Sequence, residues 1–211
     1  MRFFAGLLIL TLSGCGMAVS DKPMIEASDT AGAPQFADGV WLMPEMDEAA
    51  DCAVDTAKPV SGWPDCATWA LHRDGQWFAR DGNRGIVTKP VPRDAVIVSN
   101  GDIAIVQLES DKSADDGGTV DPTPYNFIAF DNQPAAADKL RSIRFWIVMC
   151  GQYAESDADD EDAPATLVRF PGFDEKCRPA SMQVLREAAR LSRPAASIDL
   201  PAFHWARAAL D

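Results

Sequence analysis

Residues 68–80 read TWALHRDGQWFAR. Two runs rich in strand-forming residues, Thr68–Arg73 and Gln76–Arg80, flank the dipeptide Asp74-Gly75. Asp-Gly favours the positive φ angles of a two-residue type I′ turn. The stretch therefore predicts a tight antiparallel hairpin, and a domain that contains it is expected to be built on antiparallel strands.

The turn also predicts which residues of this hairpin face each other, because turn type and loop length fix the register. His72 is expected opposite Trp77, and Leu71 opposite Phe78. Trp69, Leu71 and Phe78 then share one face, which we expect to be the core side, while His72 and Trp77 share the other.

A second hairpin is predicted where Ala95–Ser99 and Asp102–Glu109 flank Asn100-Gly101. A two-residue turn here would divide the apolar side chains into two sets. One face would carry Val96, Val98, Ile103 and Ile105, and the other Ala95, Ile97, Ala104 and Val106. Because both faces are apolar, we expect this pair to lie centrally in the sheet and to be covered on both sides.

Further strands are predicted at residues 39–43, 125–131, 142–150 and 166–170, and a helix from Pro179 to about Ser192. Phe203, His204 and Trp205 suggest a short helix docked on the sheet. The expected fold class is a β-rich α+β fold. It would be an antiparallel meander, barrel- or sandwich-like, with a C-terminal helix packed on the sheet.

Composition limits the classes of function. The chain has 211 residues, 47% of them hydrophobic, and a formal charge of −13. That length suits one domain with a real core. Nucleic-acid binding needs clustered cations, which this acidic chain lacks, so nucleic acid is not expected as a partner.

The N-terminus has the layout of a secretory signal peptide. Arg2 precedes the apolar run Phe3–Leu12, and Leu12-Ser13-Gly14-Cys15 closes it with small residues and a cysteine. The run is too short to span about 30 Å of hydrocarbon. The Leu-Ser-Gly-Cys ending resembles the lipobox of bacterial lipoproteins, which implies that Cys15 is lipidated and becomes the first residue after cleavage. The alternative is an ordinary cleaved signal with a chance cysteine.

This resemblance implies an order of segments. Residues 1–14 would be the signal peptide, 15–37 the lipidated cysteine and a flexible tether, and 38–211 one disulfide-stapled globular domain. The protein would sit in the cell envelope, facing the periplasm and held in the membrane through Cys15. Gly16 is not the acidic residue of the inner-membrane retention rule, which favours the outer membrane.

The other four cysteines form an even set in an oxidising compartment. We expect the two most local pairings, Cys52–Cys66 and Cys150–Cys177, each stabilising the fold by about 3 kcal/mol in the chain-entropy model. A four-cysteine metal site is the alternative, but no pair has the two-residue spacing typical of structural zinc. No metal or other cofactor is expected.

Three side chains are candidates for binding: Trp63, His72 and Trp77. Trp63 lies in the long connection 44–66, where it either plugs the end of the core or faces a partner. His72 and Trp77 share a face of the first hairpin, so Trp77 could offer a stacking surface.

Catalysis has weak support. The two histidines, His72 and His204, could act as a base or a metal ligand. No Gly-x-Ser-x-Gly, His-Glu-x-x-His or Ser-x-x-Lys element occurs. The acidic run 155–162 lacks the EF-hand pattern and is interpreted as a solvated loop. Whether the protein is an enzyme stays uncertain, and we lean against it.

Gly39-Val40-Trp41 is similar to the Gly-x-Trp of lipocalins, a family that also carries a helix after its last barrel strand. The resemblance implies a carrier of a small apolar ligand. Three classes of function remain open: a non-enzymatic binding or structural module that contacts envelope proteins or a small ligand, a lipocalin-like carrier, and a periplasmic hydrolase.

Overall fold

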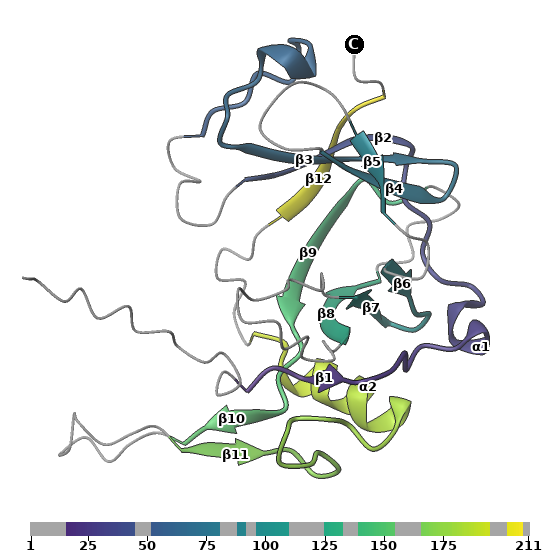
Figure 1. Cartoon of the computed structure of the whole chain (residues 1–211), viewed down its shortest axis with the longest axis vertical. Coiled ribbons are helices and arrows are strands. Elements are labelled where there is room, and N and C mark those ends of the chain that lie inside the picture. The colour runs from purple at the N-terminus through teal and green to yellow at the C-terminus, as the bar shows by residue number, and fades with distance from the viewer. Residues whose placement is uncertain are drawn as a thin grey trace, which may run out of the picture.

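The computed structural model describes residues 16–44, 52–80, 88–91, 96–109, 125–132, 139–154, 166–194 and 202–208. Cys15, the signal peptide and the acidic run 155–162 lie outside these ranges, so the expectations for them stay predictions. The described residues form a β-rich fold with a curled antiparallel sheet and a C-terminal helix (Figure 1). The predicted fold class is confirmed.

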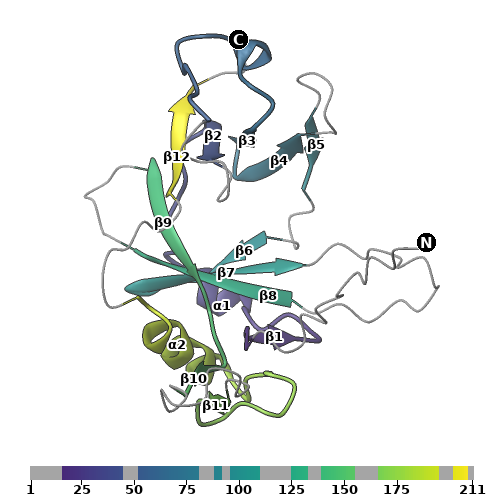
Figure 2. The same cartoon turned by 90° about the vertical axis from the view of Figure 1, so that its left-hand side faces the viewer.

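The main sheet consists of two antiparallel meanders joined by one strand. The upper arm contains β2 (Gly39–Pro44), β3 (Ala67–Arg73), β4 (Gln76–Arg80) and β5 (Thr88–Pro90). The lower arm contains β6 (Val96–Val98), β7 (Ile103–Glu109), β8 (Tyr125–Asp131) and β9 (Ser142–Ile147). Figure 2 shows the arms as the two limbs of a C, connected along one side by β9 and β12.

The strand that joins the arms is the C-terminal β12 (Ala202–Arg207), which lies between β2 and β9. The expectation of a short helix around Phe203, His204 and Trp205 is therefore wrong. His204 lies opposite both Leu42 of β2 and Ser142 of β9. The backbone groups of this segment are satisfied by two strands, which a docked helix could not do.

The first hairpin is confirmed in detail. Asp74 and Gly75 have φ angles of 51° and 73°, as a type I′ turn requires. His72 pairs with Trp77 and Leu71 with Phe78. Both faces of β3 are nevertheless covered, since His72 is 5% exposed.

The second hairpin forms with a different register. Val98 pairs with Val106 and not with Ile103, so the predicted division of side chains between the faces is wrong. Val96, Val98, Ala104, Val106 and Leu108 face into the curl, and Ile97, Ile103 and Ile105 face the helix. The hairpin is covered on both sides as expected, but it is not central, because β6 ends the strand order.

The reason is that Asn100-Gly101 belongs to a wider loop held by other elements. The Asn100 backbone N–H donates to Asp29 O at 2.7 Å, and its side-chain amide donates to Ala31 O at 2.7 Å. Ser99 N–H donates to Ile105 O at 2.9 Å, so the loop between these two residues is longer than a two-residue turn. Tertiary contacts have overridden the local turn preference.

Helix α2 (Met182–Leu191) packs across the outer face of the lower arm. It begins after Ser181, whose Oγ accepts a hydrogen bond from Val184 N, and not at Pro179 as predicted. Leu185, Ala188 and Ala189 are buried against Ile105, Phe127 and Trp146. The indole of Trp146 donates to Ala189 O at 2.9 Å, which fixes the helix to β9.

Residues 16–37, the N-terminal strap, are not a flexible tether, and this expectation is wrong. The strap contains β1 (Val19–Ser20), which pairs with β8, and α1 (Ala27–Thr30). Ala18, Ile25 and Phe36 are 1%, 4% and 7% exposed. Most of the strap is irregular, so its sequence shows neither the period of a helix nor that of a strand.

Backbone and side-chain bonds hold the strap along its length. Cys150 N–H donates to Gly16 O at 2.6 Å, and Ala18 N–H to Val148 O at 2.8 Å. The fully buried Gln107 accepts at Oε1 from the N–H groups of Met24 and Ile25, at 2.7 and 3.1 Å. The folded domain therefore includes the described residues from Gly16 onward.

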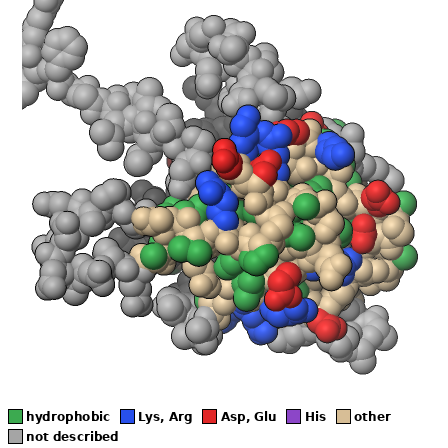
Figure 3. All heavy atoms as spheres, turned by 90° about the horizontal axis from the view of Figure 1, so that it is seen from below, with side chains coloured by type: hydrophobic (Ala, Val, Ile, Leu, Met, Phe, Trp, Pro, Cys, Tyr) green, Lys and Arg blue, Asp and Glu red, His purple; other side chains and the backbone are tan. Residues whose placement is uncertain are grey.

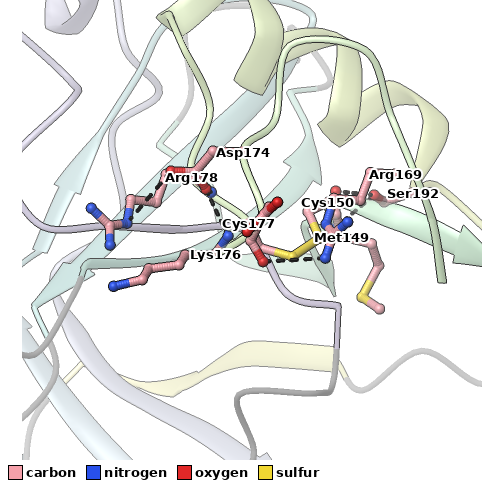
Figure 4. Close-up of a disulfide and its surroundings, with 9 residues drawn as sticks. Met149, Cys150, Arg169, Asp174, Lys176, Cys177, Arg178 and Ser192 are labelled. Atoms are coloured by element: carbon pink, nitrogen blue, oxygen red, sulfur yellow. Dashed lines mark hydrogen bonds and ion pairs between the residues drawn. A yellow bond between two sulfur atoms is a disulfide. The ribbon is translucent and has the colours of Figure 1, made fainter.

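Both predicted disulfides are present: Cys52–Cys66 and Cys150–Cys177 have Cα–Cα distances of 5.9 and 5.3 Å, within the normal range. The first closes a loop containing a 3₁₀ turn, Val60–Gly62. The second joins the residue before β10 (Gly151–Tyr153) to the loop that precedes α2 (Figure 4). β10 pairs with β11 (Leu167–Arg169) in a separate hairpin.

Candidate functional site

A pocket of about 380 Å³ opens between the two arms of the sheet. Small-molecule sites have volumes of roughly 300 to 1,000 Å³, so this space suits a small ligand. The thirteen lining residues within the described part of the chain are all apolar. We refer to it as the apolar cavity.

Most of the wall residues of the apolar cavity come from the two predicted hairpins, and Val91 and Ile128 come from the segments paired with them. The upper wall consists of Ala70, Trp77, Ala79 and Val91. The lower wall consists of Val96, Val98, Val106, Leu108 and Ile128. In the observed register Val98 pairs with Val106, three residues beyond the Ile103 that a two-residue turn would place opposite it. This register puts Val96, Val98 and Val106 on the inner face and so shapes the lower wall of the cavity.

The remaining lining residues, Phe36, Ile143, Phe145 and Phe203, come from the strap, β9 and β12. Phe36 lies with its ring centroid 5.3 Å from that of Trp77, and Phe203 lies 5.5 Å from Trp77. Aromatic pairs at these separations are attractive beyond their burial. The cavity thus has an aromatic floor assembled from three distant parts of the chain.

Space remains in the upper wall because two alanines face each other across β3 and β4. Ala70 pairs with Ala79 in the antiparallel register. A methyl side chain fills far less of the curl than the indole of Trp77, which lies two pairs closer to the turn and on the same face. The small pair leaves the hollow that larger residues would have closed.

A second, polar pocket of about 340 Å³ adjoins the apolar cavity at its rim. The two share Phe36, Trp77, Val96 and Val98, and the rim pocket adds Gln35, His72 and Lys139. Among the described residues, those of the rim pocket would therefore bring polar side chains to a molecule in the apolar cavity.

The polar groups of the rim pocket are linked through Asp38. Lys139 Nζ donates to Asp38 Oδ2 at 2.7 Å, and His72 Nδ1 lies 3.2 Å from Asp38 Oδ1. The bond from Lys139 holds the pKa of Asp38 below its usual value. Burial lowers the pKa of His72, against the opposing effect of Asp38. The neutral imidazole is therefore favoured at neutral pH, beside a compensated pair of charges.

The candidate residues are distributed unevenly over this site. Trp77 lines both pockets and His72 lines the rim. Trp63 is 8% exposed in a separate cluster with Val60 and Trp69, and its indole donates to Lys58 O, which matches the structural interpretation. His204 lies on β12 and does not line either pocket.

Phe36, Asp38 and Lys139 were not anticipated. Phe36 and Asp38 lie where a tether was predicted to end, and Lys139 follows a connecting segment. The Gln35-Phe36 step, a large aromatic within small residues, is the one signal in the sequence that could have indicated a buried contact.

The nine described residues that line the rim pocket do not assemble a nucleophile triad, since none of them carries a hydroxyl or a thiol. His72 Nδ1 lies 3.2 Å from Asp38 Oδ1 without a well-aligned hydrogen bond, so the base and orienting residue of such a triad are also incomplete. Among the residues that the structure describes, no group of three or more His, Cys, Asp or Glu side chains is placed to hold a metal ion.

The sheet order also departs from the topology that the Gly-x-Trp resemblance implies. Lipocalins are up-and-down barrels, whereas here the last strand is inserted between β2 and β9. Trp41 is fully buried and donates to Ala37 O at 2.9 Å. Within the described ranges no helix has the length and apolarity needed to cross a bilayer. Comparisons with models of known families, with curated proteins and with solved structures give no match.

Proposed function

We propose that this protein is a lipid-anchored cell-envelope lipoprotein whose domain binds a small apolar ligand in the cavity between its two sheet arms. The observation that carries the binding function is the apolar cavity itself, with thirteen apolar lining residues and about 380 Å³ of space. A site of this composition gains affinity by removing apolar ligand surface from water. This proposal favours the carrier over the hydrolase and over a purely structural module.

The envelope location rests on the N-terminal sequence. The apolar run and the lipobox-like ending at Cys15 support lipidation. Because Gly16 is already bonded to Cys150, an anchor at Cys15 would hold the domain directly at the membrane. Seen from below (Figure 3), this end of the molecule carries apolar, acidic and basic side chains in a mixture, so the lipid and not a charged patch would supply the attachment.

Cell fractionation tests the anchor. Replacing Cys15 by Ala should move the protein from the membrane fraction to the soluble fraction. Retention of the variant in membranes would contradict lipid anchoring through this cysteine.

Filling the cavity tests the binding function. We expect the neutral fluorophore N-phenyl-1-naphthylamine to brighten in the presence of the mature chain carrying Cys15→Ser. Adding Ala70→Phe should abolish this signal, because the new ring occupies the upper wall. Thr68→Phe is the matched control, since Thr68 lies two residues away on β3, is exposed and does not line the cavity. Equal signals from both phenylalanine variants would refute binding at this site.

A further inference from the structure

The polar rim pocket specifies more about the ligand than the apolar cavity does. The two spaces are contiguous, since Phe36, Trp77, Val96 and Val98 line both. One is wholly apolar and the other adds Gln35, His72 and Lys139. A ligand that used both would have an apolar body and one polar end.

The charges at the rim decide what kind of polar end fits. Lys139 is the one cation among the described residues that line it, and it is already paired with Asp38. An anionic head would approach Lys139 only against the Asp38 carboxylate, and a cationic head would approach Asp38 only against Lys139. Neither charge is left uncompensated, so a charged head would lose hydration without gaining a free counter-charge.

An uncharged head does not meet this problem. His72 is 5% exposed, and its Nδ1 makes no well-aligned hydrogen bond despite lying near Asp38. Gln35 supplies an amide with both donor and acceptor atoms. In such surroundings a hydroxyl group can donate and accept, and an ester group can accept, without bringing a charge.

We propose that the rim pocket holds the uncharged polar head of a single-chain amphiphile whose apolar tail fills the cavity. The ligand class is thus a neutral lipid of the fatty-alcohol or monoacylglycerol type. Asp38 acts as a specificity residue, because it cancels the charge of Lys139. This inference rests on the proposed binding function and adds the selection of the head group.

Three probes with the same chain and different heads test it: decanol, decanoate and decyltrimethylammonium. In calorimetric titrations of the mature Cys15→Ser chain near neutral pH, we expect decanol to bind at least about tenfold more tightly than either charged probe. Equal affinity for decanol and decanoate would overturn the proposal.

Two substitutions at the rim then move the preference in opposite directions. Asp38→Asn frees Lys139, so decanoate should gain about tenfold or more while decanol changes little. Lys139→Gln frees Asp38, so decyltrimethylammonium should gain instead. A residue that only supported the fold would weaken all three probes together, and an unchanged order of affinities in both variants would contradict the assignment. Circular dichroism of each variant checks that the fold persists.

The outcomes separate this inference from the proposed function. If none of the probes binds and N-phenyl-1-naphthylamine also fails to bind, the binding function itself is wrong. If the fluorophore and all three probes bind with similar affinity, the apolar cavity stands and the head-group pocket does not.

Discussion

The two hairpins that line the cavity start from nearly the same turn signal and reach different structures. Asp74-Gly75 forms a two-residue turn that projects from the molecule, with open space around Gly75. Asn100-Gly101 lies between α1 and α2 and is bonded to both. Asp38 Oδ1 accepts from Asp74 N–H at 3.1 Å without altering the two-residue turn, whereas the bonds to Asn100 accompany a wider loop. A turn dipeptide therefore fixes a register where the contacts around it are compatible with the turn, and not where other elements hold a different loop.

The second hairpin is also the more deeply buried, which gives the largest expected effect. Ile105 is fully buried between β7 and α2. Ile105→Ala should lower the free energy of unfolding by about 2–5 kcal/mol, through lost burial and the cavity left behind. Ile147→Ala is the matched control, since Ile147 is 44% exposed. Urea denaturation of both variants measures the difference, and similar losses would contradict the burial of β7.

The two turn glycines should differ when each is replaced by Ala. Gly101 has φ of +116°, and a Cβ there would lie 2.9 Å from Nη1 of Arg186. Gly101→Ala should cost about 1–3 kcal/mol from an unfavourable backbone conformation and the displaced arginine. Gly75→Ala, at φ of +73° with nothing nearby, should cost only about 1 kcal/mol.

Thermal unfolding of the two glycine variants checks this order. A larger loss from Gly75→Ala would mean that the exposed turn, and not the anchored loop, is the more demanding one.

Arg186 connects the anchored loop to both helices. Its guanidinium donates to Asn100 O and Oδ1 at 3.2 and 3.1 Å, and to Asp29 Oδ1 at 3.2 Å. With its side chain one-third exposed, Arg186→Ala should cost about 1–2 kcal/mol. Arg190→Ala on the same helix should cost less than about 1 kcal/mol, because Arg190 pairs only with exposed Glu187.

Hydrogen exchange sharpens this prediction. Arg186→Ala should raise the exchange rate of the Asn100 amide, which donates a hydrogen bond to Asp29 O. The exchange rates of the β3–β4 amides should not change. Uniform acceleration over both hairpins would show that Arg186 acts on global stability alone.

The smallest expected effect is a pH dependence of stability that arises from His72, in the first hairpin. Burial lowers the pKa of His72 from its usual 6.5, and Asp38 and Lys139 are the charged groups that face it. The unfolded chain therefore binds this proton more readily than the folded chain. The contribution of His72 to the free energy of unfolding should be fully present above pH 6.5 and be lost as the pH falls through the lowered pKa of the folded state.

Urea midpoints from about pH 8 to about pH 5 test this dependence. His72→Phe should flatten the slope, because it removes the titrating imidazole. Asp38 also has a lowered pKa, but it loses its contribution only below its usual 3.8, outside this window. An unchanged slope in His72→Phe would mean that another group titrates.

How much of the molecule was predictable depends on how local the interactions are. The β3–β4 hairpin, both disulfides and α2 follow from contacts between residues close in sequence, and the sequence predicted each of them with small errors at the ends. Half of the candidate site came with them, since Trp77 and His72 lie on the predicted hairpin. Phe36, Asp38 and Lys139 did not, because their roles depend on partners in other segments.

The sequence by itself determined the strand-rich class, the Asp74-Gly75 register and the cysteine pairs, because these depend on backbone preferences and short loop closures. Only the tertiary structure decided that Ala202–Arg207 would complete the sheet between β2 and β9, that the strap would be ordered, and that the Asn100 loop would shift its hairpin. In each case the deciding partners lie far away in sequence, and no local pattern records them. The apolar cavity depends on these long-range contacts together with the β3–β4 hairpin, whose register the sequence predicted, and the β6–β7 hairpin, whose register it did not.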